Sequence, residues 1–267
     1  MMQRMRSVLF VPGDRPERFD KALTSGADVI VIDLEDAVLP EGKVRARELV
    51  RAWPHSNRSV IVRTNSINTE WFNEDLQMLN QASYRAMMLP KAQSVEDLDS
   101  VISVCGPDMR IYPLIETVKG VVSQREIAAH AATERLIFGS VDFSKDSGIL
   151  DEAGWLSFRV EMVIASKLAG LSGPIDGTLL SWDNPEYIRE QASISRGLGF
   201  AGRLCIHPLQ VIPVNQGMLA SDAQIEWAKK VVTAYENSVA GAIVVDSKLV
   251  DKPVYELARE WLAQLPD

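Results

Sequence analysis

Short apolar runs recur along this chain, and nearly every one ends beside a residue that can do chemistry. The runs are rich in Val, Ile and Leu without clean alternation, which is typical of strands covered on both faces. Eight such runs occur, and a parallel barrel has eight strands whose carboxyl ends gather at one mouth. The runs, with the residues they lead into, are 7–11 (Pro12, Gly13), 28–34 (Glu35, Asp36), 60–62 (Arg63, Asn65), 86–89 (Lys91), 111–115 (Glu116), 136–139 (Asp142), 173–175 (Asp176) and 203–206 (His207).

Stretches of helical composition separate the runs, so strand and helix alternate in an α/β pattern. Such alternation gives a parallel sheet with right-handed crossovers, either open and doubly wound or closed into a barrel. All eight runs look alike, and the first lacks the Gly-x-Gly-x-x-Gly turn of a dinucleotide-binding sheet. We therefore predict a (β/α)8 TIM barrel over residues 1–220. The predicted helical stretches are 15–26, 43–53, 69–82, 94–105, 118–132, 154–170, 185–197 and 209–219.

The pattern changes near residue 220, and residues 221–267 are not needed to close a barrel. A helix is predicted over 223–239 and a final amphipathic helix over 254–265. Between them, Asp246-Ser247 separates two short apolar strands and predicts a hairpin. We expect this helix–hairpin–helix appendage to cap the barrel mouth or to reach a neighbouring subunit.

Composition narrows the class of protein. The chain has 267 residues, 46% of them hydrophobic, which fits one barrel of roughly 250 residues. Its net charge is −8 and no long basic stripe occurs, so neither nucleic acid nor a membrane is expected as a partner. The short apolar run after Arg4 and Arg6 is interpreted as the first strand and not as a signal peptide. Cys105 and Cys205 are expected to be buried, reduced thiols, which favours a cytoplasmic location.

Acidic residues follow neighbouring strands of the predicted barrel. Glu116 ends the fifth strand and Asp142 follows the sixth, so their carboxylates are expected to lie close together. Two close carboxylates share a proton or a cation, and Mg²⁺ typically takes one or two carboxylates and fills its shell with water and substrate. Glu35 and Asp36 are placed to hold those waters. Taken singly, Glu116 and Asp142 are equally well explained as helix caps or ion-pair partners; together they favour a metal site.

Basic residues end strands at the same mouth. The Arg63 guanidinium matches a carboxylate in two hydrogen bonds, so it is expected to orient an anionic substrate, to pair with Glu35 or Asp36, or both. Lys91 either pairs with the carboxylates or a phosphate, or forms a Schiff base with a ketone. The neighbouring carboxylates would keep its amine protonated, which argues against the Schiff base.

Histidines and other motifs add little. Of the three histidines, His55 and His130 fall in loop or helix contexts, so a three-histidine zinc site is not predicted. His207 is either a general base or a structural residue. The sequence contains no nucleophile elbow, P-loop or Cys-x-x-Cys motif.

Seven short motifs occur in order along the chain. As an ordered set they resemble the citrate lyase beta-subunit family, a branch of the HpcH/HpaI aldolase superfamily that also holds malyl-CoA and citramalyl-CoA lyases. The resemblance covers essentially the whole chain. The motifs are Arg6-Ser7-x-Leu9-Phe10-Val11-Pro12-Gly13, Asp33-Leu34-Glu35-Asp36-Ala37-Val38, Arg63-x-Asn65, Leu89-Pro90-Lys91, Ile115-Glu116-Thr117, Asp142-Phe143 and Ile206-His207-Pro208.

The resemblance implies a (β/α)8 barrel and a magnesium-dependent carbon–carbon lyase. The family's metal ligands match Glu116 and Asp142, and its substrate-carboxylate arginine matches Arg63. Its acidic pair near the metal-bound waters matches Glu35 and Asp36.

The resemblance also implies an acid/base aspartate and an oligomer. In the CoA-ester lyases a C-terminal aspartate acts as acid/base, often in the neighbouring subunit's site, and Leu249-Val250-Asp251 is similar to its motif, with Leu249 in place of methionine. The family implies homotrimers or dimers of trimers, that is, hexamers. By location alone, Arg6 and Lys91 are candidates for contacting CoA.

The predicted reaction is Mg²⁺-dependent cleavage of a 3-hydroxy-3-carboxyacyl thioester, of the citramalyl-, citryl- or malyl-CoA type, to a 2-oxo acid and acetyl-CoA. Glu116 and Asp142 hold the metal, Arg63 binds the substrate carboxylate, and Asp251 protonates the thioester enolate. Two alternatives are open. In the first alternative, the chain is the beta subunit of a citrate lyase complex that acts on an acyl-carrier-protein thioester. In the second, it is a Schiff-base aldolase that uses Lys91.

Overall fold

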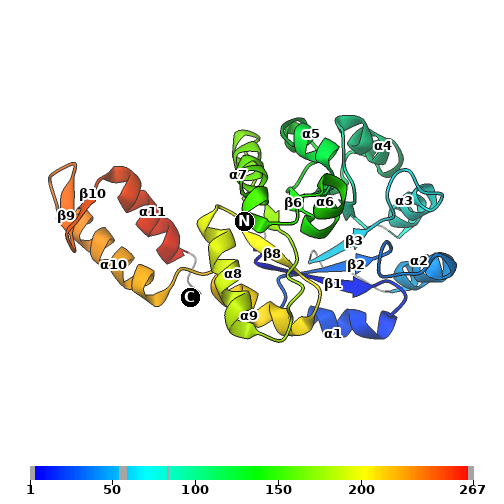
Figure 1. Ribbon diagram of the computed structural model, residues 1–267, viewed down its shortest axis with the longest axis horizontal. Coiled ribbons are helices and arrows are strands. Elements are labelled where there is room, and N and C mark those ends of the chain that lie inside the picture. Colours follow the sequence, from blue (N-terminus) through cyan, green and yellow to red (C-terminus); the bar gives the residue numbers. More distant parts are fainter. Residues whose placement is uncertain (1–3, 54–58, 83, 264–267) are drawn as a thin grey trace.

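A closed barrel of eight parallel strands forms the centre of the computed structural model, which describes residues 4–53, 59–82 and 84–263 (Figure 1). Each strand pairs with the next along the chain, and β8 closes onto β1. The predicted TIM barrel is confirmed, and each apolar run contributes one strand. The strands are β1 (Ser7–Pro12), β2 (Val29–Asp33), β3 (Val60–Arg63), β4 (Ala86–Leu89), β5 (Arg110–Ile115), β6 (Ile137–Phe138), β7 (Ile175–Asp176) and β8 (Gly202–Cys205).

Helices surround the barrel (Figure 1). One of them, α6 (Ser140–Ser147), was not predicted, because its sequence carries Ser, Asp and Lys in place of an apolar stripe. Across the described ranges, no helix is long and apolar enough to cross a membrane. The predicted helical stretches are confirmed as α1 (Phe19–Leu23), α2 (Lys43–Ala52), α3 (Phe72–Gln81), α4 (Val95–Cys105), α5 (Val118–Ala129), α7 (Glu152–Leu168), α8 (Pro185–Gly197) and α9 (Val211–Gly217).

Alternation along the strands decides which side chains reach the mouth. Successive side chains point to opposite faces of a sheet. Val31, Ile61 and Leu114 belong to the buried cluster inside the barrel, whereas their neighbours Ile32, Val62 and Ile115 pack between barrel and helices. The side chains two positions beyond the interior set therefore face into the barrel above its filled floor. In β2, β3 and β5 those side chains are Asp33, Arg63 and Glu116.

The C-terminal extension is the predicted helix–hairpin–helix unit. Asp246 and Ser247 have φ values of 48° and 62°, as a two-residue type I′ turn requires. The extension has its own small apolar core, which includes Val231, Val245 and Val250. It lies beyond α8, to one side of the barrel (Figure 1). Its elements are α10 (Asp222–Glu236), β9 (Ile243–Val245), β10 (Lys248–Val250) and α11 (Lys252–Ala263); the last residues of the predicted final helix lie outside the described ranges.

Both cysteines are free and buried, as predicted. Burial raises the pKa of the Cys105 thiol to about 11 and that of Cys205 to about 12. Neutral thiols with such pKa values are poor nucleophiles and poor metal ligands.

Candidate active site

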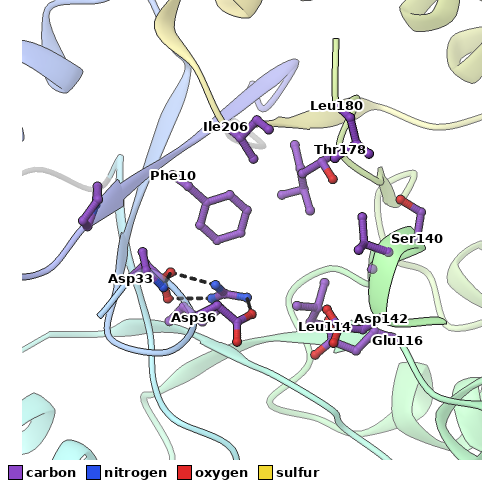
Figure 2. A pocket seen from close by; sticks show the side chains of 16 residues that line it. Phe10, Asp33, Asp36, Leu114, Glu116, Ser140, Asp142, Thr178, Leu180 and Ile206 are labelled. Atoms are coloured by element: carbon purple, nitrogen blue, oxygen red, sulfur yellow. Dashed lines mark hydrogen bonds and ion pairs between the residues drawn. The ribbon is translucent and has the colours of Figure 1, made fainter. Parts of the chain in front are cut away.

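A pocket of about 400 Å³ opens at the carboxyl ends of the barrel strands (Figure 2). Acidic side chains line two parts of it: Figure 2 shows Asp33 and Asp36 on one side and Glu116 and Asp142 on the other. Apolar side chains line another part. The pocket is lined by Phe10, Pro12, Asp33, Asp36, Ala37, Arg63, Leu114, Glu116, Gly139, Ser140, Val141, Asp142, Thr178, Leu180, Leu204 and Ile206.

Arg63 is the basic centre of the pocket. Its Nε and Nη2 donate to Oδ1 and Oδ2 of Asp33, each at 2.7 Å. Its Nη1 lies 3.0 Å from a Glu35 carboxylate oxygen and 3.3 Å from one of Asp36. The guanidinium also lies over the Phe10 ring, 4.8 Å from its centre. The predicted pairing of Arg63 with Glu35 and Asp36 is confirmed, but its principal partner is Asp33.

No role was predicted for Asp33, although its inward position follows from that of Val31 two residues earlier. It is 2% exposed. Burial by itself raises the pKa of Asp33, but the charge and hydrogen bonds of Arg63 outweigh burial and hold the pKa below its usual range. Asp33 is therefore an ionised carboxylate that neutralises Arg63 from inside the barrel.

Hydrogen bonds from two buried side chains, Asp33 and Lys43, hold the loop that carries Glu35 and Asp36. The Asp33 carboxylate accepts hydrogen bonds from the backbone N–H of Glu35 at 2.9 Å and of Ala37 at 3.0 Å. The buried Lys43 ammonium donates to the carbonyls of Leu34 at 2.7 Å and Glu35 at 2.6 Å. Lys43 lies in the first turn of α2 and gave no signal in the sequence, because a lysine there is normally exposed.

Lys91 joins two of the acids. Its Nζ donates to Glu35 Oε1 at 2.6 Å and lies 3.9 Å from Glu116 Oε1. Its backbone N–H donates to the same Glu116 oxygen at 2.9 Å, with Lys91 in a left-handed conformation (φ 51°) that is costly for a non-glycine residue. Burial by itself lowers the pKa of Lys91, but the hydrogen bond and charge of Glu35 raise it above its usual value. Lys91 is thus an ion-paired ammonium.

Glu116 and Asp142 line the same pocket, and Asp142 is close enough for its charge to act on Glu116. Glu116 is 2% exposed, and burial together with the charges of Glu35 and Asp142 raises its pKa to about 8. Such a site favours a proton or a cation. At Gly139, a side-chain Cβ would lie 2.6 Å from Glu116 Oε2, so glycine leaves room for this carboxylate. No group of three or more His, Cys, Asp or Glu residues in the described ranges is placed to hold a metal. Mg²⁺ typically takes only one or two protein carboxylates and fills its shell with water and substrate.

Arg6 does not lie in this pocket. It precedes β1, and its guanidinium donates to Asp28, which precedes β2, at 2.9 Å. Both residues are therefore at the amino ends of the strands, whereas the pocket is at the carboxyl ends. The prediction that Arg6 contacts CoA at this chain's own pocket is corrected on that ground.

Asp251 also lies outside the lining of this chain's pocket. It follows β10, and its carboxylate accepts a hydrogen bond from the backbone N–H of Val254 at 3.3 Å, at the start of α11. In one copy of the chain, Asp251 therefore caps a helix of the extension.

Three other strand-end residues have structural roles. Asp176 points outward from β7 and accepts hydrogen bonds from Arg159, Ser195 and Arg203. The Asn65 side chain donates to the buried Asp75. The ring of His207 accepts a hydrogen bond from the backbone N–H two residues later. These residues stabilise the loops and helices around the barrel and do not line the pocket.

The chain belongs to the HpcH/HpaI aldolase/citrate lyase family, whose sequence profile matches residues 6–208. It is 32% identical to a (3S)-malyl-CoA thioesterase of Cereibacter sphaeroides, over 97% of this chain and 94% of that one. It is 31% identical to an L-malyl-CoA/beta-methylmalyl-CoA lyase of Rhodobacter capsulatus, over 92% and 90% of the two chains. The crystal structure of CitE from Mycobacterium tuberculosis in complex with magnesium, acetoacetate and coenzyme A superposes with a TM-score of 0.89 at 30% identity, over 98% of each chain.

Proposed function

We propose that the protein is an Mg²⁺-dependent lyase that cleaves a 3-hydroxy-3-carboxyacyl-CoA into a 2-oxo acid and acetyl-CoA. The observation that carries the proposal is the pair Glu116 and Asp142, which shares one pocket with Arg63. In the reaction the hydroxyl loses its proton and the bond between the carbinol carbon and the α carbon breaks. The electron pair stays on the α carbon as a thioester enolate, which takes up one proton. No oxidant or reductant is needed.

The residues of the pocket divide this work. Glu116 and Asp142 would hold Mg²⁺, and the bound ion would supply positive charge to acidify the hydroxyl and stabilise negative charge on its oxygen. Arg63 binds the substrate carboxylate through the N–H groups that Asp33 leaves free. Glu35 and Asp36 hold ordered water through which the hydroxyl proton leaves. Lys91 keeps Glu116 in position through its backbone N–H.

The pKa of Glu116 predicts that metal binding releases a proton. In the metal-free protein this pKa is about 8, so below that pH Mg²⁺ has to displace the Glu116 proton. The apparent Kd for Mg²⁺ is expected to fall about tenfold per pH unit between pH 6 and 7 and to level off above about pH 8. Titration calorimetry in buffers of different ionisation enthalpy measures the released proton. A pH-independent affinity would remove Glu116 from the metal site.

We propose that Asp251 acts in the pocket of a neighbouring subunit. The extension lies to one side of its own barrel (Figure 1), and its hairpin exposes the directly paired Val244 and Leu249, which are 70% and 69% exposed. Contiguous exposed apolar patches mark interaction surfaces, and another chain that packed on the hairpin would bury these two side chains together. A homotrimer or hexamer in which each extension reaches the next barrel covers this surface and delivers Asp251 to protonate the enolate.

Mixing two inactive variants tests this arrangement. Asp251→Asn and Glu116→Gln are each expected to be inactive as pure oligomers. Random mixed oligomers should regain about a quarter of the wild-type activity, because some sites combine an intact Glu116 with the intact Asp251 of a neighbour. The measurement is 2-oxo acid release after subunit exchange. If Asp251 acts within its own chain, the mixture stays as inactive as its parents.

A second candidate function is hydrolysis of the thioester, because the chain is 32% identical to a malyl-CoA thioesterase. The two reactions give different products: a lyase releases a 2-oxo acid and acetyl-CoA, whereas a thioesterase releases a hydroxy diacid and free CoA. Purified protein is therefore incubated with malyl-, citramalyl- and citryl-CoA with and without Mg²⁺, and 2-oxo acid and free thiol are both measured. We expect 2-oxo acid without an excess of free CoA. Cleavage that persists in EDTA would contradict the proposal.

The sequence left open two other functions, a Schiff-base aldolase and a citrate lyase beta subunit that acts on an acyl-carrier-protein thioester. The Lys91 amine is held as an ammonium by Glu35, so it is not available as a Schiff-base nucleophile. Borohydride with pyruvate is expected to trap no adduct. Cleavage of an acyl-carrier-protein thioester in preference to the CoA thioesters would favour the citrate lyase subunit instead.

A further inference from the structure

The amino end of the barrel carries two arginines that no acidic side chain neutralises. Arg110 begins β5, and Arg135 lies two residues before β6. Within the described ranges, neither guanidinium makes an ion pair or a hydrogen bond. We infer that Arg110, Arg135 and the Tyr112 hydroxyl form a binding site for a small oxyanion of the phosphate or carboxylate type. The site is at the end of the barrel opposite the pocket, so its occupancy is separate from the proposed lyase reaction.

The alternation of side chains places both arginines on the inner face. Tyr112 belongs to the apolar cluster inside the barrel, so Arg110, two residues earlier on the same strand, points to the same face. In the segment that leads into β6, Leu136 packs outward among the helices and Ile137 packs inward. Arg135 comes before Leu136 and is 6% exposed, as expected for a side chain directed beneath the interior of the barrel.

Both arginines are close to the Tyr112 phenol. Burial raises the pKa of Tyr112, as does the negative charge of Glu134, and the positive charges of Arg110 and Arg135 act in the opposite direction. Each of these charges is therefore near the phenol. Burial lowers the pKa of Arg135, but an arginine in a protein does not lose its proton. An enclosed cation of this kind is stabilised by a counter-ion.

The three side chains offer hydrogen-bond donors and no negative charge. Arg135 Nε is enclosed and has no hydrogen-bond partner among the described residues, and an unpaired buried donor costs free energy. A guanidinium presents its N–H groups as a fork that matches two oxygens of a phosphate or a carboxylate. The Tyr112 hydroxyl, on a residue that is 2% exposed, adds a neutral donor. An oxyanion between the two guanidinium groups would accept hydrogen bonds from all three side chains.

Two acidic residues precede strands at this end of the barrel, and neither pairs with the arginines of the site. Asp28 is held by Arg6, whose guanidinium donates to both of its carboxylate oxygens at 2.9 Å. Glu134 is exposed and makes no ion pair in the part of the chain that the structure describes. Two arginines and one glutamate leave the surroundings of the phenol with a net positive charge, which attracts an anion.

Inorganic phosphate tests the site on the intact protein. With Mg²⁺ absent and the ionic strength held constant with chloride, about 10 mM phosphate is expected to raise the Tm by about 2–4 °C. Titration calorimetry should give a Kd of about 1 mM. Arg135→Met should abolish both responses. In chloride alone its Tm should equal or exceed that of the wild type, because the substitution removes a buried charge that has no partner, so loss of binding is not loss of fold.

Arg85→Gln is the matched control, because it removes one positive charge from the same end of the barrel. Arg85 is exposed, precedes the inward-facing Ala86 and donates to the backbone carbonyl of Tyr84 at 3.2 Å. Salt screens an exposed charge, so the Kd for phosphate should stay within about twofold of wild type. Equal stabilisation of Arg85→Gln, Arg135→Met and the wild type, as salts excluded from protein surfaces produce, overturns the inference.

Acetate distinguishes the two sources of the oxyanion. Phosphate bound at least about tenfold more tightly than acetate assigns the site to a ligand with a phosphate group, because a phosphate dianion offers oxygens to both guanidinium groups. Acetate bound as tightly as phosphate assigns it to a carboxylate ligand. Either order supports an oxyanion site, provided that Arg135→Met abolishes the binding. Absence of binding of both anions to the wild type overturns the inference.

Discussion

Glu116→Gln is expected to abolish Mg²⁺-dependent cleavage and, at the same time, to stabilise the metal-free protein. Gln keeps the shape of the side chain and the oxygen that accepts the Lys91 N–H, but it loses the charge that binds the ion. Loss of a direct ligand should lower kcat/KM by more than the roughly 10–100-fold that loss of a ligand's supporting partner costs. The measurement is 2-oxo acid release across a range of Mg²⁺ concentrations.

The gain in stability follows from the same carboxylate. Burial, Glu35 and Asp142 raise the pKa of Glu116 to about 8, so the folded state favours the protonated form and loses stability as the pH rises above about 4.5. At about pH 7 the Gln variant should therefore gain about 2–4 kcal/mol in the free energy of unfolding without Mg²⁺. Added Mg²⁺ should stabilise the wild type and not the variant.

An exposed glutamate provides the matched control for this pair of effects. Glu126 lies on α5 with its side chain in solvent, and Glu126→Gln should change neither stability nor cleavage. A Glu116→Gln protein that is both inactive and less stable would indicate a structural carboxylate and not a metal ligand.

The strands were predictable because a strand covered on both faces has to consist almost entirely of apolar residues. Eight doubly covered strands require eight apolar runs, and the closed barrel followed from their likeness. The helix α6 was missed because its first turn carries Ser140 and Asp142, which line the pocket. These polar residues stand where an amphipathic helix would have the apolar stripe that identifies it in a sequence. The hairpin was predictable because Asp246-Ser247 meets the conformational demand of a two-residue turn.

The site was predictable to the extent that strand ends converge. Arg63, Glu116 and Asp142 share one pocket, as predicted. The supporting roles of Asp33 and Lys43 were not predicted. Both residues contact segments distant in the sequence, and such contacts cannot be derived from the spacing of residues along the chain. Arg6 was misplaced for a simpler reason: it precedes a strand, and the amino ends of the strands lie at the face of the barrel opposite the active site.

Arg63→Met is expected to cost both activity and fold stability. The change leaves the buried Asp33 without the guanidinium that is hydrogen-bonded to it, and breaking a buried ion pair from one side costs about 3–5 kcal/mol in the free energy of unfolding. In the wild type, the lowered pKa of Asp33 contributes stability above about pH 4 that is lost as the pH falls further. The deficit of the variant should therefore be largest near neutral pH and narrow toward about pH 4. Chemical denaturation at several pH values measures it.

A second substitution separates stability from substrate binding. In Arg63→Met/Asp33→Asn the buried charge is gone from both sides, so the double variant should recover about half or more of the lost free energy of unfolding. It should remain inactive and should not bind pyruvate in calorimetry, because the substrate carboxylate has lost its cation while Glu116 and Asp142 are intact. Mg²⁺ affinity then serves as the internal control and should stay within about tenfold of wild type. A stable double variant that regains cleavage would show that Arg63 only neutralises Asp33, and the substrate carboxylate would have to be held by the metal site alone.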